Sequence, residues 1–298
     1  MDQVLSVVVD GAIYSAWLFI AALGLTLVYG VMRIINITHG SFYAIGAYSA
    51  ASFTGAWLAA GGAPMLSYAV LVVSAVLVAL VLAPVIERGL LRYMYARDEV
   101  VLLLGTYALF LILEDVVKLV WGVNPYFIAE PYGLLGSFSV GRLIYPVYNL
   151  LLIGVALAAG VALTLLMHRT RAGKLLLAVI DDPELSKAMG IDVGRFYLAA
   201  FTLGAVLAAL AGALTAPTVS VVPGLGVDVI VLSFSVVVIG GLGSLPGAAL
   251  GALIVGVVRS VSVHYAPQLE LFVIYLVMAI VLAFRPRGLF AAAEPRRI

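Results

Sequence analysis

Runs of about twenty apolar residues recur along the whole chain, and no other feature restricts its fold as strongly. Each run is long enough to cross roughly 30 Å of hydrocarbon as a helix, which rises about 1.5 Å per residue. The hydrophobic segments are 5–31, 35–60, 64–86, 100–121, 147–167, 197–216, 228–244, 247–263 and 268–284. The pattern predicts an all-α polytopic membrane protein of about 8–10 transmembrane helices, forming one domain over residues 1–298.

The composition excludes several other classes of protein. Hydrophobic residues make up 64% of the chain and charged residues 10%, so a water-soluble enzyme is excluded. The net charge of +1 gives no indication of nucleic-acid binding. No cysteine is present, so disulfides and thiolate metal sites are impossible. The three histidines are scattered, and we expect no metal site.

Lysine and arginine indicate the orientation, because basic residues near segment ends are retained on the cytoplasmic side. Twelve of the sixteen basic residues are Arg88, Arg92, Arg97, Arg169, Arg171, Lys174, Lys187, Arg195, Arg285, Arg287, Arg296 and Arg297. They predict a cytoplasmic loop at 168–196, whereas 122–146, with Arg142 alone, is expected outside. Counting back places the N-terminus outside, although a re-entrant stretch near residue 40 would reverse that side.

Two apolar regions are interrupted by glycine and polar residues, one at 30–46 and one at 240–247. Irregular backbone survives in lipid only where protein buries it or where it lines a water-filled path. Corresponding interruptions in the two halves of a chain point to a transport path. The residues expected to line that path are Asn36, Thr38, His39, Ser41, Tyr43, Gly240, Gly241, Gly243 and Ser244.

Both regions also have a simpler interpretation. Asn36 or Thr38 suits the cap of a helix, with His39 bonded to a carbonyl group, and this alternative is as well supported as a path lining. The stretch 244–247 also fits an ordinary turn between two short helices. For this second stretch the turn is the favoured local interpretation.

Charged residues inside the apolar segments are hypotheses of function by default. Glu114 and Lys118 have the favourable i, i+4 order for an ion pair, with Asp115 beside them. An ion-coupled carrier would use such residues, but their position near the outside loop favours an interfacial ion pair. Arg259 lies near the outer end of its segment and is expected to extend to the membrane surface.

Small residues repeat at four-residue spacing in the segments 197–216 and 247–263. The first series is Gly204, Ala208, Gly212 and Ala216, and the second pairs Gly247 with Gly251 and Ala252 with Gly256. Such faces allow helices to approach closely in a membrane. The pattern predicts a tight bundle and indicates no particular activity.

The loop 168–196 contains the signature of a short helix over 183–189. Asp182 suits its N-cap, Pro183 its first position and Gly190 the left-handed position after its end. A small apolar face between charged flanks is typical of a helix that docks on another protein, although a helix lying on the membrane surface is the alternative. The residues of this docking element are Asp182, Pro183, Glu184, Leu185, Ala188, Met189 and Gly190.

The chain has no nucleotide-binding or hydrolytic motif that could make it an enzyme. Gly173-Lys174 is followed by leucine and lacks the earlier glycine of a phosphate-binding loop. Nucleophile elbow, zinc-protease and paired-carboxylate patterns are also missing.

Several blocks in the correct order resemble a known family. They are GLTLVYGVMRIIN at 24–36 followed by His39-Gly40, the sequence GAY at 46–48, AMGI at 188–191, VIGGLGSLPG at 238–247 and RPRGLF at 285–290. This pattern resembles the branched-chain amino-acid permeases of ABC importers, most closely their H-type subunit. The similarity spans roughly residues 11–50 and 178–290.

The resemblance implies a fold like that of the type II importers and a place in the bacterial inner membrane. It also implies a complex with a second, M-type permease, two cytoplasmic ATPases that hold ATP and Mg²⁺, and a periplasmic binding protein. In such complexes the segment 182–190 would be the coupling helix. Thr38 departs from the family, which usually has alanine before the His-Gly pair. Relatives in the family transport urea, short amides or aromatic acids.

The sequence therefore predicts a permease subunit that imports branched-chain amino acids or related small polar solutes and has no catalytic residue or cofactor of its own. The main alternative is a stand-alone ion-coupled carrier or channel that uses Glu114, Asp115 and Lys118. An intramembrane enzyme is a second alternative, but no nucleophile and base stand at a suitable spacing.

Overall fold

The structure is a computed structural model that describes residues 2–141 and 143–290. Its long helices are α1 (Asp2–Met32), α2 (His39–Ala59), α3 (Ser67–Gly89), α4 (Glu99–Trp121), α6 (Tyr148–Arg169), α9 (Val193–Thr215), α10 (Leu225–Gly240), α11 (Leu245–Tyr265) and α12 (Glu270–Phe284). Each predicted segment corresponds to one of these helices. Seven candidate spans, which leave out α2 and α10, are long and apolar enough to cross a membrane. The predicted polytopic helical fold is confirmed.

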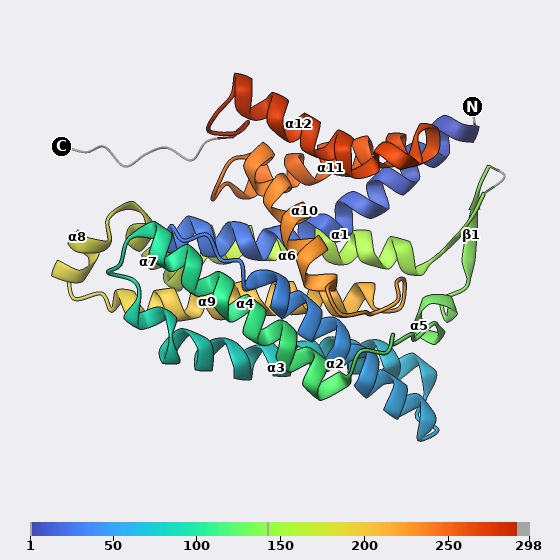
Figure 1. Ribbon diagram of the computed structural model, residues 1–298, viewed down its shortest axis with the longest axis horizontal. Coiled ribbons are helices and arrows are strands. Elements are labelled where there is room, and N and C mark those ends of the chain that lie inside the picture. Colours follow the sequence, from blue (N-terminus) through green and yellow to red (C-terminus); the bar gives the residue numbers. More distant parts are fainter. Residues whose placement is uncertain (1, 142, 291–298) are drawn as a thin grey trace.

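The helices form a bundle around α1, which packs against α11, α9, α6 and α10, while α2 packs against α9 and α3. Three one-turn 3-10 helices connect the elements, η1 (Pro64–Leu66), η2 (Leu91–Tyr93) and η3 (Pro267–Leu269). Figure 1 shows the N-terminus and the strand β1 (Ser137–Val140) at one end of the bundle and the short helix α8 (Pro183–Ala188) at the other.

Small residues allow the central helices to touch through their backbones. A Cβ on Gly204 of α9 would meet Gly24 and Val28 of α1, and a Cβ on Gly212 would collide with the backbone of Tyr43 in α2. Lipid tails are as apolar as leucine, so packing between helices must come from close van der Waals contact. The predicted small-residue faces are therefore the contact surfaces of the bundle.

The chain between α1 and α2 is irregular and turns back along α1. His39 Nε2 lies 2.8 Å from the carbonyl oxygen of Ala21, about 16 Å along the helix from the end of α1 at Met32. The backbone in between is satisfied by α4, since the hydroxyl of Thr106 lies 3.1 Å from the carbonyl oxygen of Ile35 and 3.4 Å from the amide nitrogen of Ile37. This partner explains how an irregular segment is tolerated inside the bundle.

The outside loop 122–146 is more ordered than the sequence predicts. It contains a one-turn helix, α5 (Glu130–Gly133), and an antiparallel hairpin of β1 (Ser137–Val140) and β2 (Leu143–Pro146), in which Phe138 pairs with Tyr145. This hairpin is a small addition to the predicted helical fold. Four residues of alternation are too short to predict a strand from sequence, and strands this short are stabilised by their pairing.

The loop 168–196 holds two helices where the sequence analysis found one. The missed helix, α7 (Arg171–Asp181), is capped by the side chain of Thr170, which accepts a hydrogen bond of 2.9 Å from the amide of Gly173. Gly173 and Val179 are buried because α7 packs against α6 and α1. The segment 168–196 is thus a helical layer at the end of the bundle.

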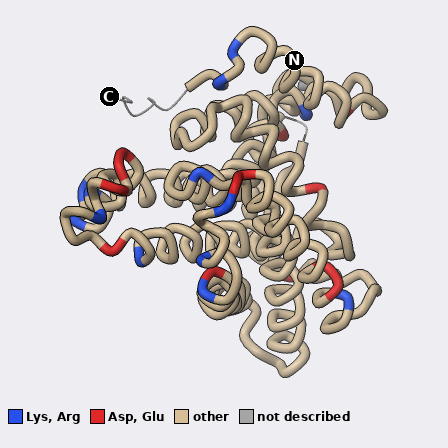
Figure 2. Tube along the Cα trace, turned by 60° about the vertical axis from the view of Figure 1, so that its left-hand side comes forward, with Lys and Arg blue, Asp and Glu red and all other residues tan. Residues whose placement is uncertain are grey.

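Basic side chains are distributed as the sequence predicts. Figure 2 shows a dense group of charged positions at the α7 and α8 end, and the turn between α3 and α4, which carries Arg88, Arg92 and Arg97, lies at this end in Figure 1. Arg142, Arg296 and Arg297 lie outside the described residues. The N-terminus lies at the opposite end of the bundle, and its side of the membrane stays a prediction.

Candidate functional site

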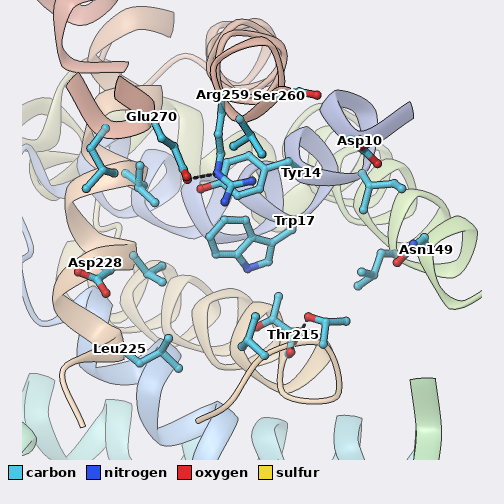
Figure 3. A pocket seen from close by; sticks show the side chains of 18 of the residues that line it. Asp10, Tyr14, Trp17, Asn149, Thr215, Leu225, Asp228, Arg259, Ser260 and Glu270 are labelled. Atoms are coloured by element: carbon cyan, nitrogen blue, oxygen red, sulfur yellow. Dashed lines mark hydrogen bonds and ion pairs between the residues drawn. The ribbon is translucent and has the colours of Figure 1, made fainter. Parts of the chain in front are cut away.

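A cavity of about 990 Å³ opens among α1, α6, α9, α10, α11 and α12. Its residues come from the ends of these elements near the N-terminus and the hairpin, and Figure 3 shows many of them. The polar and aromatic side chains in its lining are Asp10, Tyr14, Trp17, Tyr43, Tyr132, Tyr145, Asn149, Thr215, Thr218, Asp228, Arg259, Ser260, His264, Glu270 and Tyr275. A cavity of this size and mixed lining is suited to a small polar solute.

Arg259 forms the best-defined charge cluster of the cavity. Its Nε lies 2.6 Å from Oε1 of Glu270, and its guanidinium carbon lies 3.9 Å from the centre of the Tyr14 ring. The prediction that Arg259 extends to the membrane surface is wrong, because the ion pair and the aromatic face hold it at the cavity (Figure 3). These contacts join α1, α11 and α12 around one positive charge.

A chain of hydrogen bonds crosses another side of the cavity, from α1 through α2 to α9. Trp17 Nε1 donates to the hydroxyl of Tyr43 at 3.1 Å, and the Tyr43 hydroxyl contacts that of Thr215. Thr215 donates its proton to the carbonyl oxygen of Ala211 at 2.9 Å, so Tyr43 must be the donor to Thr215. All three side chains are oriented by these bonds.

The electrostatic balance of the cavity is negative. Three carboxylates, Asp10, Asp228 and Glu270, face one guanidinium and one imidazole, so the sign holds whether or not His264 is protonated. Oδ2 of Asp10 lies 3.4 Å from Nε2 of His264. At the rim, burial and the neighbouring Asp10 carboxylate raise the pKa of Tyr145 in the hairpin. The rim is therefore polar without carrying a further charge at neutral pH.

The predicted polar cluster is buried, but only one of its members reaches the cavity. Asn36, Thr38, His39 and Ser41 are at most 1% exposed and lie between the helices, with the Thr38 hydroxyl donating to the carbonyl oxygen of Thr106 at 2.9 Å. Tyr43 alone lines the cavity. The first residue of α2 is His39, so Asn36 lies before the helix. The interpretation of this segment as a helix start therefore describes it better than the interpretation as a path lining. Their role in a path stays a prediction.

The second glycine region lies at the other end of the bundle, near α7. Gly240 packs against Gly247, and Gly243 approaches Gly30 of α1, so the two interrupted regions do meet each other. Ser244 caps α11 by accepting a hydrogen bond of 3.1 Å from the amide of Gly247, which is the turn that the alternative interpretation expected.

Residues 288–290 pack against this glycine region and bond to its backbone. The amide nitrogens of Leu289 and Phe290 donate to the carbonyl oxygens of Ile239 and Gly240, at 3.0 and 2.8 Å. Gly241, whose φ is +111°, contacts Gly288. None of Gly240, Gly241, Gly243 and Ser244 lines the large cavity, and Gly243 borders a smaller one of about 180 Å³.

The start of α10 is anchored by a buried carboxylate. Oε1 of Glu114 accepts a hydrogen bond of 2.5 Å from the amide of Gly224, and Glu114 is 8% exposed. The predicted pair of Glu114 with Lys118 is wrong, since Lys118 binds the exposed Asp115 at 3.0 Å instead. Glu114 turns inward because unpaired amides at a helix start attract a carboxylate. This also fixes the contact between Gly226 of α10 and Gly40 of α2.

The short helix α8 in the segment 168–196 has the predicted local structure. Oδ1 of Asp182 accepts a hydrogen bond of 2.8 Å from the amide of Leu185, and Gly190 has a φ of +84°. Leu185 is 58% exposed and Met189 is 74% exposed, so the apolar face of α8 is uncovered in this chain. Its docking to a partner stays a prediction.

Sequence reasoning missed most of the cavity. Tyr14 and Trp17 could not be distinguished from other aromatic residues in an apolar helix. Asp228 and Glu270 stand at the starts of apolar segments, where acidic residues are common for local reasons. The one usable signal was Arg259, a charge within a membrane segment.

Comparison with known proteins agrees with this architecture. A family model described as the branched-chain amino acid transport system permease component matches residues 7–282. The high-affinity branched-chain amino acid transport system permease protein BraD of Pseudomonas aeruginosa is 28% identical over 97% of this chain and 96% of its own length. LivH of Escherichia coli K12, a permease of the same description, is 28% identical over 100% of this chain and 97% of its own.

Two further matches extend the comparison. A probable branched-chain amino acid transport permease protein LivH of Methanocaldococcus jannaschii is 32% identical over 87% of this chain and 81% of its own. PsaBC from Streptococcus pneumoniae, solved in complex with Fab, superimposes with a TM-score of 0.48 at 15% identity, over 97% of this chain and 92% of that one. With its multiple membrane-spanning helices and a family match along almost its entire length, the chain is a multi-pass inner-membrane protein and belongs to the family of branched-chain amino acid transport permeases.

Proposed function

We propose that this chain is the transmembrane permease subunit of an ATP-driven importer for branched-chain amino acids or related small polar solutes. It would work with a second, M-type permease, two cytoplasmic ATPases that bind ATP and Mg²⁺, and a periplasmic binding protein that delivers the solute. The chain itself would hold no nucleotide or cofactor and would act as the path.

The observation that carries the proposal is the uncovered apolar face of α8. Its ends are fixed by Asp182 and Gly190, yet Leu185 and Met189 are exposed at the end of the bundle that carries most of the basic residues. A rigid helix with an open apolar face is suited to dock in a groove of another protein. Its link to the bundle through α7 would transmit a movement of the ATPases to α1 and α6.

The cavity supports the same proposal from the other end of the molecule. It is lined by Tyr132 of α5 and by Tyr145 of the hairpin, so its mouth lies on the side away from α8. A solute delivered outside would therefore enter a polar, aromatic space inside the bundle. Rigid-body motion between inward- and outward-facing states would then release it to the cytoplasm.

The ion-coupled carrier is supported less well by the contacts of its candidate residues. Glu114 is bonded to the backbone of Gly224, and Asp115 and Lys118 pair at the surface, with 73% and 41% of their side chains exposed. A coupling ion would have to break the contact that anchors α10. Urea, short amides or aromatic acids remain alternative solutes for the same path.

The test is reconstitution of the importer with a substitution on α8. The chain is co-purified with its cytoplasmic subunits, and solute-stimulated ATP hydrolysis is measured in proteoliposomes for the wild type and Met189→Asp. The matched control is Tyr93→Asp, because Tyr93 is 75% exposed in another turn at the same end of the bundle, against 74% for Met189.

We expect Met189→Asp to abolish ATPase association or stimulation, and Tyr93→Asp to retain both. Absence of any associated ATPase, combined with uptake that follows an ion gradient, would contradict the proposal. Equal loss in both variants would remove α8 as the docking element.

A further inference from the structure

Most charged groups in the cavity are already engaged with one another. Glu270 occupies one side of the Arg259 guanidinium at 2.6 Å and the Tyr14 ring covers its face at 3.9 Å, as Figure 3 shows. Asp10 and His264 face each other at 3.4 Å. The positive groups of the cavity are thus each placed against a carboxylate.

Asp228 is different. It is exposed, lines the cavity from the first turns of α10, and has no basic partner within residues 2–141 and 143–290. The start of α10 accounts for a carboxylate only in part, since the amide of Gly224 is already taken by Glu114. Such a carboxylate, in a cavity lined by apolar helices, favours a role in binding.

The surroundings of Asp228 suit a cation. Tyr275 of α12 lines the same cavity as Asp228, and so do the rings of Trp17 and Tyr43. Aromatic faces attract cationic groups, and Arg259 over Tyr14 shows this preference within the cavity itself. A carboxylate that shares a cavity with aromatic rings is a suitable receptor for an ammonium group.

We propose that Asp228 binds the ammonium group of the transported solute, so that the cavity selects solutes that carry an ammonium group and rejects those that carry only a carboxylate. This inference rests on the proposed transport function and narrows its substrate class. The net negative lining repels simple carboxylates such as aromatic acids. It also gives uncharged solutes such as urea no advantage over amines.

The experiment compares three ligands with the same branched carbon body. L-leucinamide carries an ammonium group alone, L-leucine carries ammonium and carboxylate, and 4-methylpentanoate carries the carboxylate alone. Their dissociation constants are measured by microscale thermophoresis on the full chain in lipid nanodiscs. The variants are Asp228→Asn, which removes the charge, and Asp228→Glu, which keeps it. Asp115→Asn is the control, because Asp115 is a carboxylate outside the cavity.

In the wild type, we expect leucinamide and leucine to bind at least about tenfold more tightly than 4-methylpentanoate, which corresponds to about 1.4 kcal/mol. Asp228→Asn should remove this difference by weakening the two amines, while Asp228→Glu and Asp115→Asn should keep it. Equal binding of all three ligands by the wild type, or no measurable binding of leucinamide, would overturn the inference. Equal weakening of all three by Asp228→Asn, with a lower melting temperature, would reduce Asp228 to a structural residue.

The outcome is separable from that of the proposed function. If the ligand order and its loss in Asp228→Asn are observed but no ATPase associates with the chain, the recognition of ammonium stands and the ATP-driven importer fails. If ATP-driven uptake is observed but Asp228→Asn leaves the ligand order unchanged, the importer stands and the assignment of Asp228 fails.

Discussion

Removing the Glu114 side chain should release the start of α10 from α4. The bond from the Gly224 amide to Glu114 is buried and accepted by a carboxylate, and bonds of this type contribute about 1.5–3 kcal/mol. The negative charge at the helix start adds about 0.3–1 kcal/mol. Glu114→Ala loses both contributions, so we expect the free energy of unfolding to fall by about 3 kcal/mol.

Glu114→Gln keeps an acceptor oxygen and loses only the charge. We expect it to cost about 1 kcal/mol, roughly a third of the effect of alanine. Both variants are compared with Asp115→Asn by thermal unfolding in detergent and by uptake in proteoliposomes. If Glu114 serves only to anchor the start of α10, we expect near-normal uptake for Glu114→Gln. If that variant folds normally but loses uptake driven by an ion gradient, Glu114 is a coupling residue and the reasoning is refuted.

Three further substitutions test the packing, the charges and the irregular segment. Gly212→Val should prevent folding because its side chain would collide with α2, whereas Gly154→Val, with nothing within 4 Å of its Cβ, should be tolerated, as measured by the yield of monodisperse protein. Arg259→Met and Glu270→Met should each destabilise the chain by about 1–3 kcal/mol, and a double-mutant cycle by thermal unfolding should give a coupling of at least about 0.5 kcal/mol; simple additivity would mean that the ion pair contributes nothing. Thr106→Val should cost about 1–3 kcal/mol in unfolding experiments and Thr106→Ser much less, because only serine retains the hydroxyl that serves the backbone between α1 and α2; equal losses would mean that the hydroxyl contributes no more to stability than the methyl group.

The helices could be predicted well because each one depends on its own composition. Hydrocarbon requires about twenty apolar residues with an internally bonded backbone, so the segments could be counted without knowing their neighbours. The ends of α8 could be predicted for the same reason, since Asp182 and Gly190 act within one turn of the helix. The hairpin escaped prediction because its strands, Ser137–Val140 and Leu143–Pro146, are stabilised by each other across the turn.

The candidate site could be predicted only in small part. Of the expected path residues, Tyr43 alone lines the large cavity, where its hydroxyl contacts Trp17 and Thr215. The polar residues before it are buried between the helices. Arg259 was identified as a charge within a membrane segment, but its side chain points into the cavity and not, as predicted, to the membrane surface. Nothing in its own segment shows that Glu270 and Tyr14 stand opposite it.

The sequence by itself determined which segments form the long apolar helices, the end of the bundle that carries the positive charge, the capped helix α8 and, through its motifs, the family. Each of these follows from residues that act within a few positions of one another. Only the tertiary structure decided that Glu114 anchors α10, that Arg259 turns inward and that Asp228 faces the cavity with no basic partner among the described residues. Such relations depend on which faces of distant helices meet, and in a bilayer that choice is made by close packing across the whole bundle.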